Sequence, residues 1–116
     1  MTDSIENVKK TALKSLENMK AKDIVCLDVK PLTSMADFMI VASGTSKRHI
    51  TAVAENVYID AKHEGIKASM EGEPGSDWVL VDMFDVIVHI MTPDTRKFYD
   101  LEKLWTMSPD NNESND

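Results

Sequence analysis

Positive charge is scarce in this sequence. The 116 residues include 13 lysines and arginines against 20 aspartates and glutamates, which gives a formal net charge of −7 at pH 7. Proteins that bind nucleic acids take much of their affinity from Lys and Arg on phosphates, so this balance argues against that class. It suits a protein that meets a basic partner, although acidity also serves simply to keep a protein soluble.

Cysteine and long apolar runs are scarce too. The single cysteine, Cys26, lies in an apolar run without a disulfide partner, so we expect a reduced, cytoplasmic protein in which this thiol is buried rather than reactive. No apolar run approaches the ~20 residues that cross a membrane. The opening stretch, MTDSIENVKK, has acidic residues and no apolar core, so we expect neither a signal peptide nor a transit peptide.

Reactive groups are few and scattered. The three histidines, His49, His63 and His89, form no His-x-x-x-His motif and have no paired cysteines nearby, so we expect no metal site and no cofactor. His89 and Asp82 resemble an acid–base pair, but no nucleophile accompanies them. A surface histidine beside a carboxylate is the preferred interpretation.

What the sequence does have is a dense segment from Trp78 to Trp105. It opens with two runs rich in Val and Ile, residues 78–83 and 86–91, which are short enough to be strands. A turn at Phe84-Asp85 joins them into an antiparallel hairpin with one aliphatic face for helices to cover. In that register Val79 faces Ile90, Val81 faces Val88, and Met83 faces Val86.

The other face of this hairpin mixes aromatic, aliphatic, acidic and imidazole side chains. Such a mixture is unusual for a core and ordinary for a surface that docks another protein. Phe84 is a poor residue for a tight turn that needs positive φ, and a three-residue loop would move His89 to the opposite face. We favour the two-residue turn because it separates polar from apolar residues. This second face then carries Trp78, Leu80, Asp82, Ile87, His89 and Met91.

The rest of the chain predicts one domain over residues 1–105 and a disordered acidic tail over 106–116. The expected order is α-β-β-α-β-β-β-α, an α/β fold with one mixed sheet of about five strands flanked by helices. The expected ranges are a helix at 3–21, strands at 24–30 and 38–44, a helix capped by Ser46 and Gly65, an edge strand at 66–72, the hairpin, and a helix from Pro93 with Phe98, Leu101, Leu104 and Trp105 facing inward.

Two features near the start of the central helix are of a kind that can bind a ligand. Gly44-Thr45-Ser46 follows a strand and precedes a helix, where a glycine and hydroxyls can bind phosphate. One glycine is a weak motif, and a satisfied helix cap is the preferred interpretation. Lys47 and Arg48, followed by His49, could touch RNA, but a solvated face is more common on an acidic protein.

Acidic residues are dense around the hairpin. Residues 71–102 contain eight carboxylates but only two cations, Arg96 and Lys97. An apolar centre with an acidic rim fits a basic protein partner. The residues alone therefore favour a binding module over an enzyme.

Three segments identify a family. DIVCLDVK, ADFMIVASGTSKRHITAVAENV and WVLVDMFDVIVHIMTPDTRKFYDLEKLW resemble the ribosomal silencing factor family, known as RsfS, YbeB or Iojap, over roughly residues 5–105. The resemblance implies a nucleotidyltransferase-like fold without established transferase activity. It also implies binding to a basic large-subunit ribosomal protein, number fourteen in the standard nomenclature, at the face that meets the small subunit. Occupying that face would block subunit joining and repress translation. The residues implied at or near the contact are Trp78, Leu80, Asp82, Met91, Tyr99 and Asp100.

Two departures from related patterns bear on function. Relatives usually have glycine in the hairpin turn where this chain has Phe84. Nucleotidyltransferases need a Gly-Ser pair followed closely by Asp-x-Asp, but here the next carboxylate after Gly44-Thr45-Ser46 is Glu55, alone. Two catalytic metal ions would then have no site. We expect a non-enzymatic translation repressor; the alternatives are a nucleotide-binding transferase using the Gly44-Thr45-Ser46 turn and an adaptor that homodimerises through the Trp78 face.

Overall fold

The computed structural model describes residues 5–72, 75–100 and 103, except for the side chain of Tyr99. Its helices and strands follow the predicted order. They are α1 (Ile5–Asn18), β1 (Lys22–Asp28), β2 (Phe38–Ser43), α2 (Lys47–His63), β3 (Ser69–Glu71), β4 (Trp78–Asp82), β5 (Val86–Met91) and α3 (Pro93–Tyr99).

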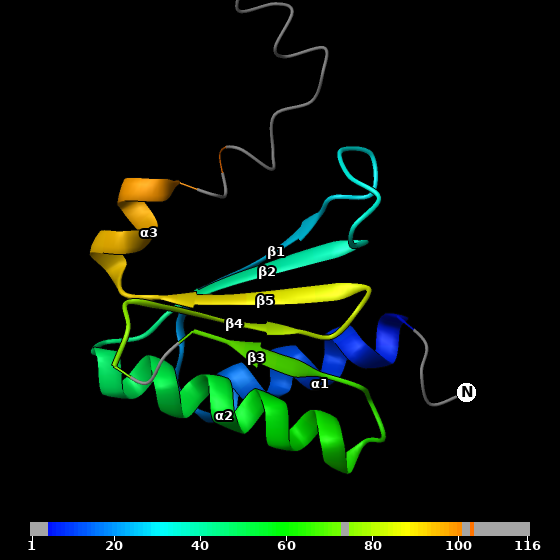
Figure 1. Cartoon of the computed structure of the whole chain (residues 1–116), viewed down its shortest axis with the longest axis horizontal. Coiled ribbons are helices and arrows are strands. Elements are labelled where there is room, and N and C mark those ends of the chain that lie inside the picture. Colours follow the sequence, from blue (N-terminus) through cyan, green and yellow to red (C-terminus); the bar gives the residue numbers. More distant parts are fainter. Residues whose placement is uncertain (1–4, 73–74, 101–102, 104–116) are drawn as a thin grey trace, which may run out of the picture.

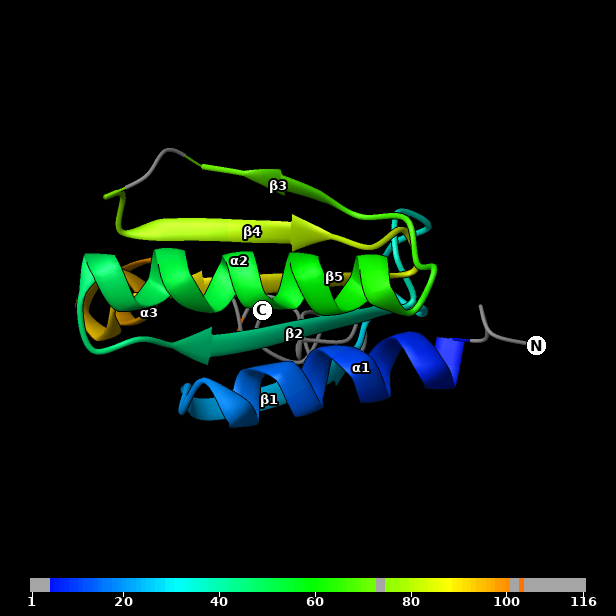
Figure 2. The ribbon, with the colours of Figure 1, turned by 90° about the horizontal axis from the view of Figure 1, so that it is seen from below.

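The five strands form one mixed sheet in the order β1-β2-β5-β4-β3. The central pair, β2 and β5, is parallel, and the other neighbours are antiparallel. Helices α1 and α2 cover one face of this sheet, while α3 lies on the opposite side at one end of the strands (Figures 1 and 2). The predicted fold class is confirmed: a single α/β domain with a five-stranded mixed sheet flanked by helices.

The hairpin has the predicted register. Val79 pairs with Ile90, Val81 with Val88 and Leu80 with His89. The connection is the two-residue turn Phe84-Asp85, closed by a 2.9 Å hydrogen bond from the Met83 N–H to the Val86 carbonyl. Phe84 adopts the positive φ that this turn requires, at 72°. The Asp82 carboxylate accepts a hydrogen bond from the Phe84 N–H at 2.9 Å, which holds the strained residue in place.

The main core lies between the helices and the aliphatic face of the hairpin. Both helices bury a stripe at helical spacing, and the hairpin offers alternate residues on the strands that face them. The fully or almost fully buried members are Val8, Ala12 and Leu16 of α1, Ile50, Val53, Ala54, Val57 and Ala61 of α2, and Val79, Val81, Val88 and Ile90 of the hairpin.

Both predicted caps of α2 are present. The Ser46 hydroxyl accepts a hydrogen bond from the His49 N–H at 3.1 Å. At the other end Gly65 has φ 75°. The N–H groups of Gly65 and Ile66 bond back to the carbonyls of Lys62 and Ala61, which is the Schellman arrangement.

Several predicted boundaries and environments were wrong. Strand β1 ends at Asp28, and β3 is limited to Ser69–Glu71. Cys26 is exposed rather than buried because β1 is an edge strand. Partial desolvation still raises the pKa of its thiol, with Glu6 and Asp28 adding to the effect, so the thiol stays protonated at neutral pH.

The last helix also differs from its predicted form. Asp100 adopts a left-handed conformation with φ 50° and ends α3 after Tyr99. Phe98, predicted to face inward, is 80% exposed. The remaining predicted inward residues, Leu101, Leu104 and Trp105, lie outside the described residues, as does the tail at 106–116.

The turn generates a stability prediction. A bulky L-residue at positive φ costs about 1–2 kcal/mol, and glycine adopts this conformation without that cost. Because the Phe84 side chain is 70% exposed, Phe84→Gly loses little packing. We expect it to raise the free energy of unfolding by about 1 kcal/mol, measured by urea denaturation.

The matched control is Phe84→Ala, which removes the ring but keeps a Cβ at positive φ. This variant should not be stabilised. If alanine stabilised the protein as much as glycine, then the exposed ring, and not the backbone conformation, would be the source of the strain.

Candidate docking surface

The sheet face opposite α1 and α2 is partly open. Alternation along the strands sends to this face the side chains that do not pack against the two helices. We call its half-exposed members the docking face: Val25 and Leu27 of β1, Trp78, Leu80 and Asp82 of β4, and Ile87 of β5. Of the helices in the described part of the chain, α3 lies on this side of the sheet, over one end of the strands (Figure 1).

Met91 belongs to a second, smaller core on the same side of the sheet. It is fully buried among Val29, Ala36, Met39 and Val41, with Trp78 packed at the margin. Its predicted place in the contact surface is therefore corrected. Met91 pairs with Trp78 across the hairpin, and because it is 0% exposed it offers no surface to a partner.

Trp78 and His89 form a hydrogen-bonded pair at the centre of the docking face. The indole N–H of Trp78 donates to Nδ1 of His89 at 3.0 Å, and the ring centroids are 5.7 Å apart. His89 is 7% exposed, and its desolvation lowers the pKa of the imidazole to about 4. The imidazole is therefore neutral at physiological pH.

This arrangement removes the acid–base pair considered from the sequence. His89 bonds to Trp78, and the Asp82 carboxylate accepts from the Phe84 amide in the turn. The two side chains have separate structural partners. The preferred interpretation of a non-catalytic histidine fits this geometry, although the histidine is almost fully buried and not on the surface.

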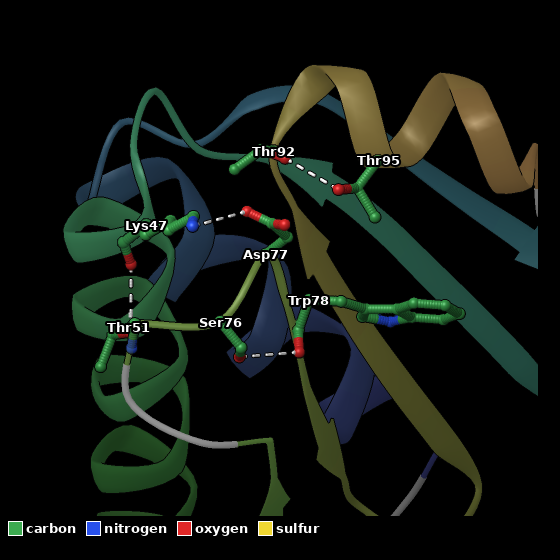
Figure 3. Close-up of polar contacts among 8 residues, drawn as sticks. Lys47, Thr51, Ser76, Asp77, Trp78, Thr92 and Thr95 are labelled. Atoms are coloured by element: carbon green, nitrogen blue, oxygen red, sulfur yellow. Dashed lines mark hydrogen bonds and ion pairs between the residues drawn. The ribbon is translucent and has the colours of Figure 1, made fainter.

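A hollow of about 510 Å³ lies beside Trp78, between the start of β4 and α3. Figure 3 shows the indole of Trp78 extending below α3, with Thr95 above it and Asp77 at the near end of the strand. Helix α3 is anchored by a 2.8 Å hydrogen bond from Arg96 Nη1 to the buried Ser43 hydroxyl. The hollow is lined by Ser76, Asp77, Trp78, Asp94, Thr95 and Phe98.

The structure brings together three of the predicted contact residues. Trp78, Leu80 and Asp82 alternate on β4 and share the docking face. Asp100 is exposed at the end of α3, and the side chain of Tyr99 lies outside the described part of the chain. Asp94 was predicted among the acidic residues around the Trp78 face, and it lines the hollow beside Trp78. Phe98 was not predicted there, because a helix continuing to Trp105 would turn its ring inward.

The Gly44-Thr45-Ser46 turn is occupied by the protein's own groups. The Thr45 N–H donates to Nδ1 of His49 at 2.9 Å, and Nε2 of His49 lies 2.8 Å from the Met19 carbonyl. A Cβ on Gly44 would clash with Cγ2 of Ile50, so this glycine permits close packing. Ser46 caps α2, which confirms the helix-cap interpretation of this motif.

The basic residues that follow the turn are exposed to solvent and line none of the main pockets among the described residues. Lys47 and Arg48 are exposed, and Lys47 forms a 3.7 Å ion pair with Asp77 (Figure 3). Across the part of the chain that the structure describes, no three His, Cys, Asp or Glu side chains gather as metal ligands. No helix in that part is long and apolar enough to cross a membrane.

Burial of His89 predicts a pH dependence of stability. In the unfolded chain the imidazole binds a proton near pH 6.5, whereas in the folded chain it does so near pH 4. Between these values the unfolded state holds more protons, so the free energy of unfolding falls as the pH falls. We expect a contribution of up to about 1.4 kcal/mol per pH unit within that window, measured by urea denaturation.

The control is His89→Gln, which cannot titrate but retains an oxygen to accept from the Trp78 indole. Carboxylates titrate alike in both proteins, so the difference between the two pH profiles isolates His89. Parallel profiles between pH 6.5 and pH 4 would contradict the prediction.

Known proteins with a similar sequence and fold belong to one family. A family described as "Ribosomal silencing factor during starvation" matches residues 2–116. Ribosomal silencing factor RsfS of Chromobacterium violaceum is 44% identical over 102 residues, which cover 87% of this chain and 84% of that protein. RsfS of Bacillus subtilis is 35% identical over 105 residues, covering 90% and 89%.

Solved structures agree. A crystal structure of a Chromobacterium violaceum protein superposes with a TM-score of 0.86 at 42% identity, covering 91% of this chain and 90% of that one. A Bacillus halodurans protein gives 0.77 at 33% identity, covering 86% and 94%. The mouse protein named mitochondrial assembly of ribosomal large subunit protein 1 is 35% identical over 96 residues, which are 42% of its length. With a family match along almost its whole length, the chain belongs to the ribosomal silencing factor (RsfS) family.

Proposed function

We propose that this protein represses translation by binding the large ribosomal subunit and sterically blocking the small subunit from joining it. The contact is a basic ribosomal protein on the intersubunit face, which the family resemblance implies is number fourteen. The observation that carries the proposal is the open docking face, an apolar strip on a rigid sheet with acidic side chains around it. Such a repressor works in the cytoplasm, where it meets ribosomes.

The chemistry of the docking face supports a protein partner. Its centre holds Trp78, Leu80 and Ile87, each half-exposed, and aromatic and aliphatic anchors of this kind dominate protein interfaces. Carboxylates surround them, as interfaces keep charge at the rim. Exposed or half-exposed acidic residues on or next to β3, the hairpin and α3 are Glu71, Asp77, Asp82, Asp85 and Asp94.

Charge complementarity favours a basic partner. The whole chain carries −7, and Lys47 is paired with Asp77, which lines the hollow. Facing charges of opposite sign speed association and exclude wrong partners. The name of the mouse relative, which refers to large-subunit assembly, supports the choice of subunit.

Repression by occlusion needs affinity and bulk but no turnover. A stable interface buries about 1,600 Å² in total, and the sheet face together with α3 offers a rigid platform for it. The transferase alternative has less support because the amides of Gly44 and Thr45 already donate within the chain, to the Met91 carbonyl and to His49. A homodimer through the docking face would compete with the ribosome, and light scattering over a concentration series would reveal it.

Trp78→Ala tests the docking face. Removing a central aromatic anchor should weaken binding to purified large subunits by about 2 kcal/mol or more. On sucrose gradients we expect wild type to travel with large subunits and to reduce joined ribosomes, whereas the variant stays near the top. Since Trp78 is half-exposed, the melting temperature of the variant should lie no more than about 5 °C below that of wild type.

The matched control is Ile59→Ala. Ile59 is also an exposed apolar residue, at 48%, but it lies on α2, the helix that covers the opposite side of the sheet. This variant should behave as wild type on the gradient. Wild type that fails to travel with large subunits would overturn the proposed function, and equal losses in both variants would overturn the choice of face.

The transferase alternative has its own test. Because the amides of Gly44 and Thr45 are engaged and no carboxylate pair follows the turn, ATP with Mg²⁺ should leave the melting temperature unchanged. Binding at a hundredfold excess over Kd would stabilise the protein by about 2.7 kcal/mol. A clear upward shift that disappears in Ser46→Ala would favour the enzyme over the repressor.

A further inference from the structure

The Trp78–His89 hydrogen bond fixes where the imidazole carries its proton. An indole nitrogen can only donate, so Nδ1 of His89 accepts and bears no hydrogen. The neutral ring must then carry its proton on Nε2. His89 is thus held as the Nε2–H tautomer, a hydrogen-bond donor with its direction set by Trp78.

This donor lies in the middle of the docking face. His89 pairs with Leu80 on one side and with Val41 on the other, and both side chains project to the same side of the sheet as the imidazole. Among the described residues no acceptor bonds to Nε2. No described side chain leaves a fully buried nitrogen or oxygen unpaired, so Nε2 is not fully buried and keeps access to solvent.

A partner that covers this face takes the water away. Burying an N–H group without an acceptor makes the free energy of binding less favourable, whereas an N–H group that finds an acceptor avoids this cost. Apolar neighbours such as Leu80 and Ile87 attract many hydrophobic surfaces without distinguishing them. A single buried donor distinguishes strongly, because a partner without an oxygen in the right place leaves it unpaired.

The surrounding charge decides which oxygen suits it. Asp82 shares the docking face with His89, and Asp77 and Asp94 line the neighbouring hollow. These carboxylates repel an anionic group that approaches the centre of the face. A neutral carbonyl oxygen, from the backbone or from an amide side chain, satisfies Nε2–H without this repulsion.

We propose that His89 is a specificity-determining residue whose Nε2–H donates to a neutral carbonyl oxygen of the basic protein partner. Trp78 then has two roles, as an apolar anchor and as the group that selects the imidazole tautomer. The inference rests on the proposed function, because it needs a partner on this face. Its geometric basis, the fixed tautomer, belongs to the free protein.

The tautomer is tested on the free protein by NMR with ¹⁵N-labelled histidine at pH 7. The shifts of the two ring nitrogens show which is protonated, and we expect His89 to carry its proton on Nε2. In Trp78→Phe, which keeps an aromatic ring but removes the indole N–H, the two tautomers should mix. A wild-type ring protonated on Nδ1, or an unchanged tautomer in Trp78→Phe, would overturn the proposal.

The contact is tested by titrating purified large ribosomal subunits in a pelleting assay. His89→Leu fills the site without a donor and should bind about tenfold more weakly, a loss of ~1.4 kcal/mol. His89→Gln keeps both an acceptor for Trp78 and an N–H donor, and should bind within about threefold of wild type. Thermal melts of both variants separate this effect from unfolding, since a merely structural role would reduce stability and binding together.

The outcomes separate the two proposals. If wild type and His89→Leu bind large subunits equally tightly, the donor role of His89 is overturned, but the docking face is not. If His89→Gln binds as weakly as His89→Leu, then the shape of the ring is what matters, and the donor role is also overturned. Wild type that does not bind large subunits overturns the proposed function itself. If His89→Leu does not fold, the comparison of His89→Gln with wild type and the tautomer measurement still decide.

Discussion

The alternation of side chains along the hairpin β4–β5 is the constraint on which the rest of the structure depends. Each strand has a period of two, and the two-residue turn at Phe84-Asp85 sets the register between them. A slip by one residue on β5 would carry His89 into the helix-covered core and bring Val88 to the open face. The positive φ of Phe84 is the local strain that accompanies this register.

From that register follow two sides with different roles. One side is aliphatic and is sealed by α1 and α2, which fixes the sheet as a rigid platform. The other side buries a smaller cluster around Met91 and leaves Trp78, Leu80 and Ile87 half-exposed. An open apolar strip on a folded domain needs a reason, because such patches mark interaction sites. Here the same strands that hold the core present the contact surface.

Local sequence signals predicted what depends on local physics. Ser46 and Gly65 have side-chain and backbone requirements that act within one turn of helix, and both were found in their predicted roles. Burial was predicted less well because it depends on distant elements. Cys26 lies in an apolar run but on an edge strand. Met91 shares its face with Trp78, yet residues from the chain beyond β1 cover it.

The Gly44-Thr45-Ser46 turn shows why a motif alone does not decide function. In a phosphate site its amides would point at a ligand, and its glycine would let that ligand approach. Here His49 takes the Thr45 N–H, and its other ring nitrogen meets the Met19 carbonyl at the end of α1. The glycine makes room for Ile50. The same residues therefore join two helices beneath the sheet, and this leaves recognition to the opposite face, where the one buried imidazole of the hairpin is held neutral and ready to donate.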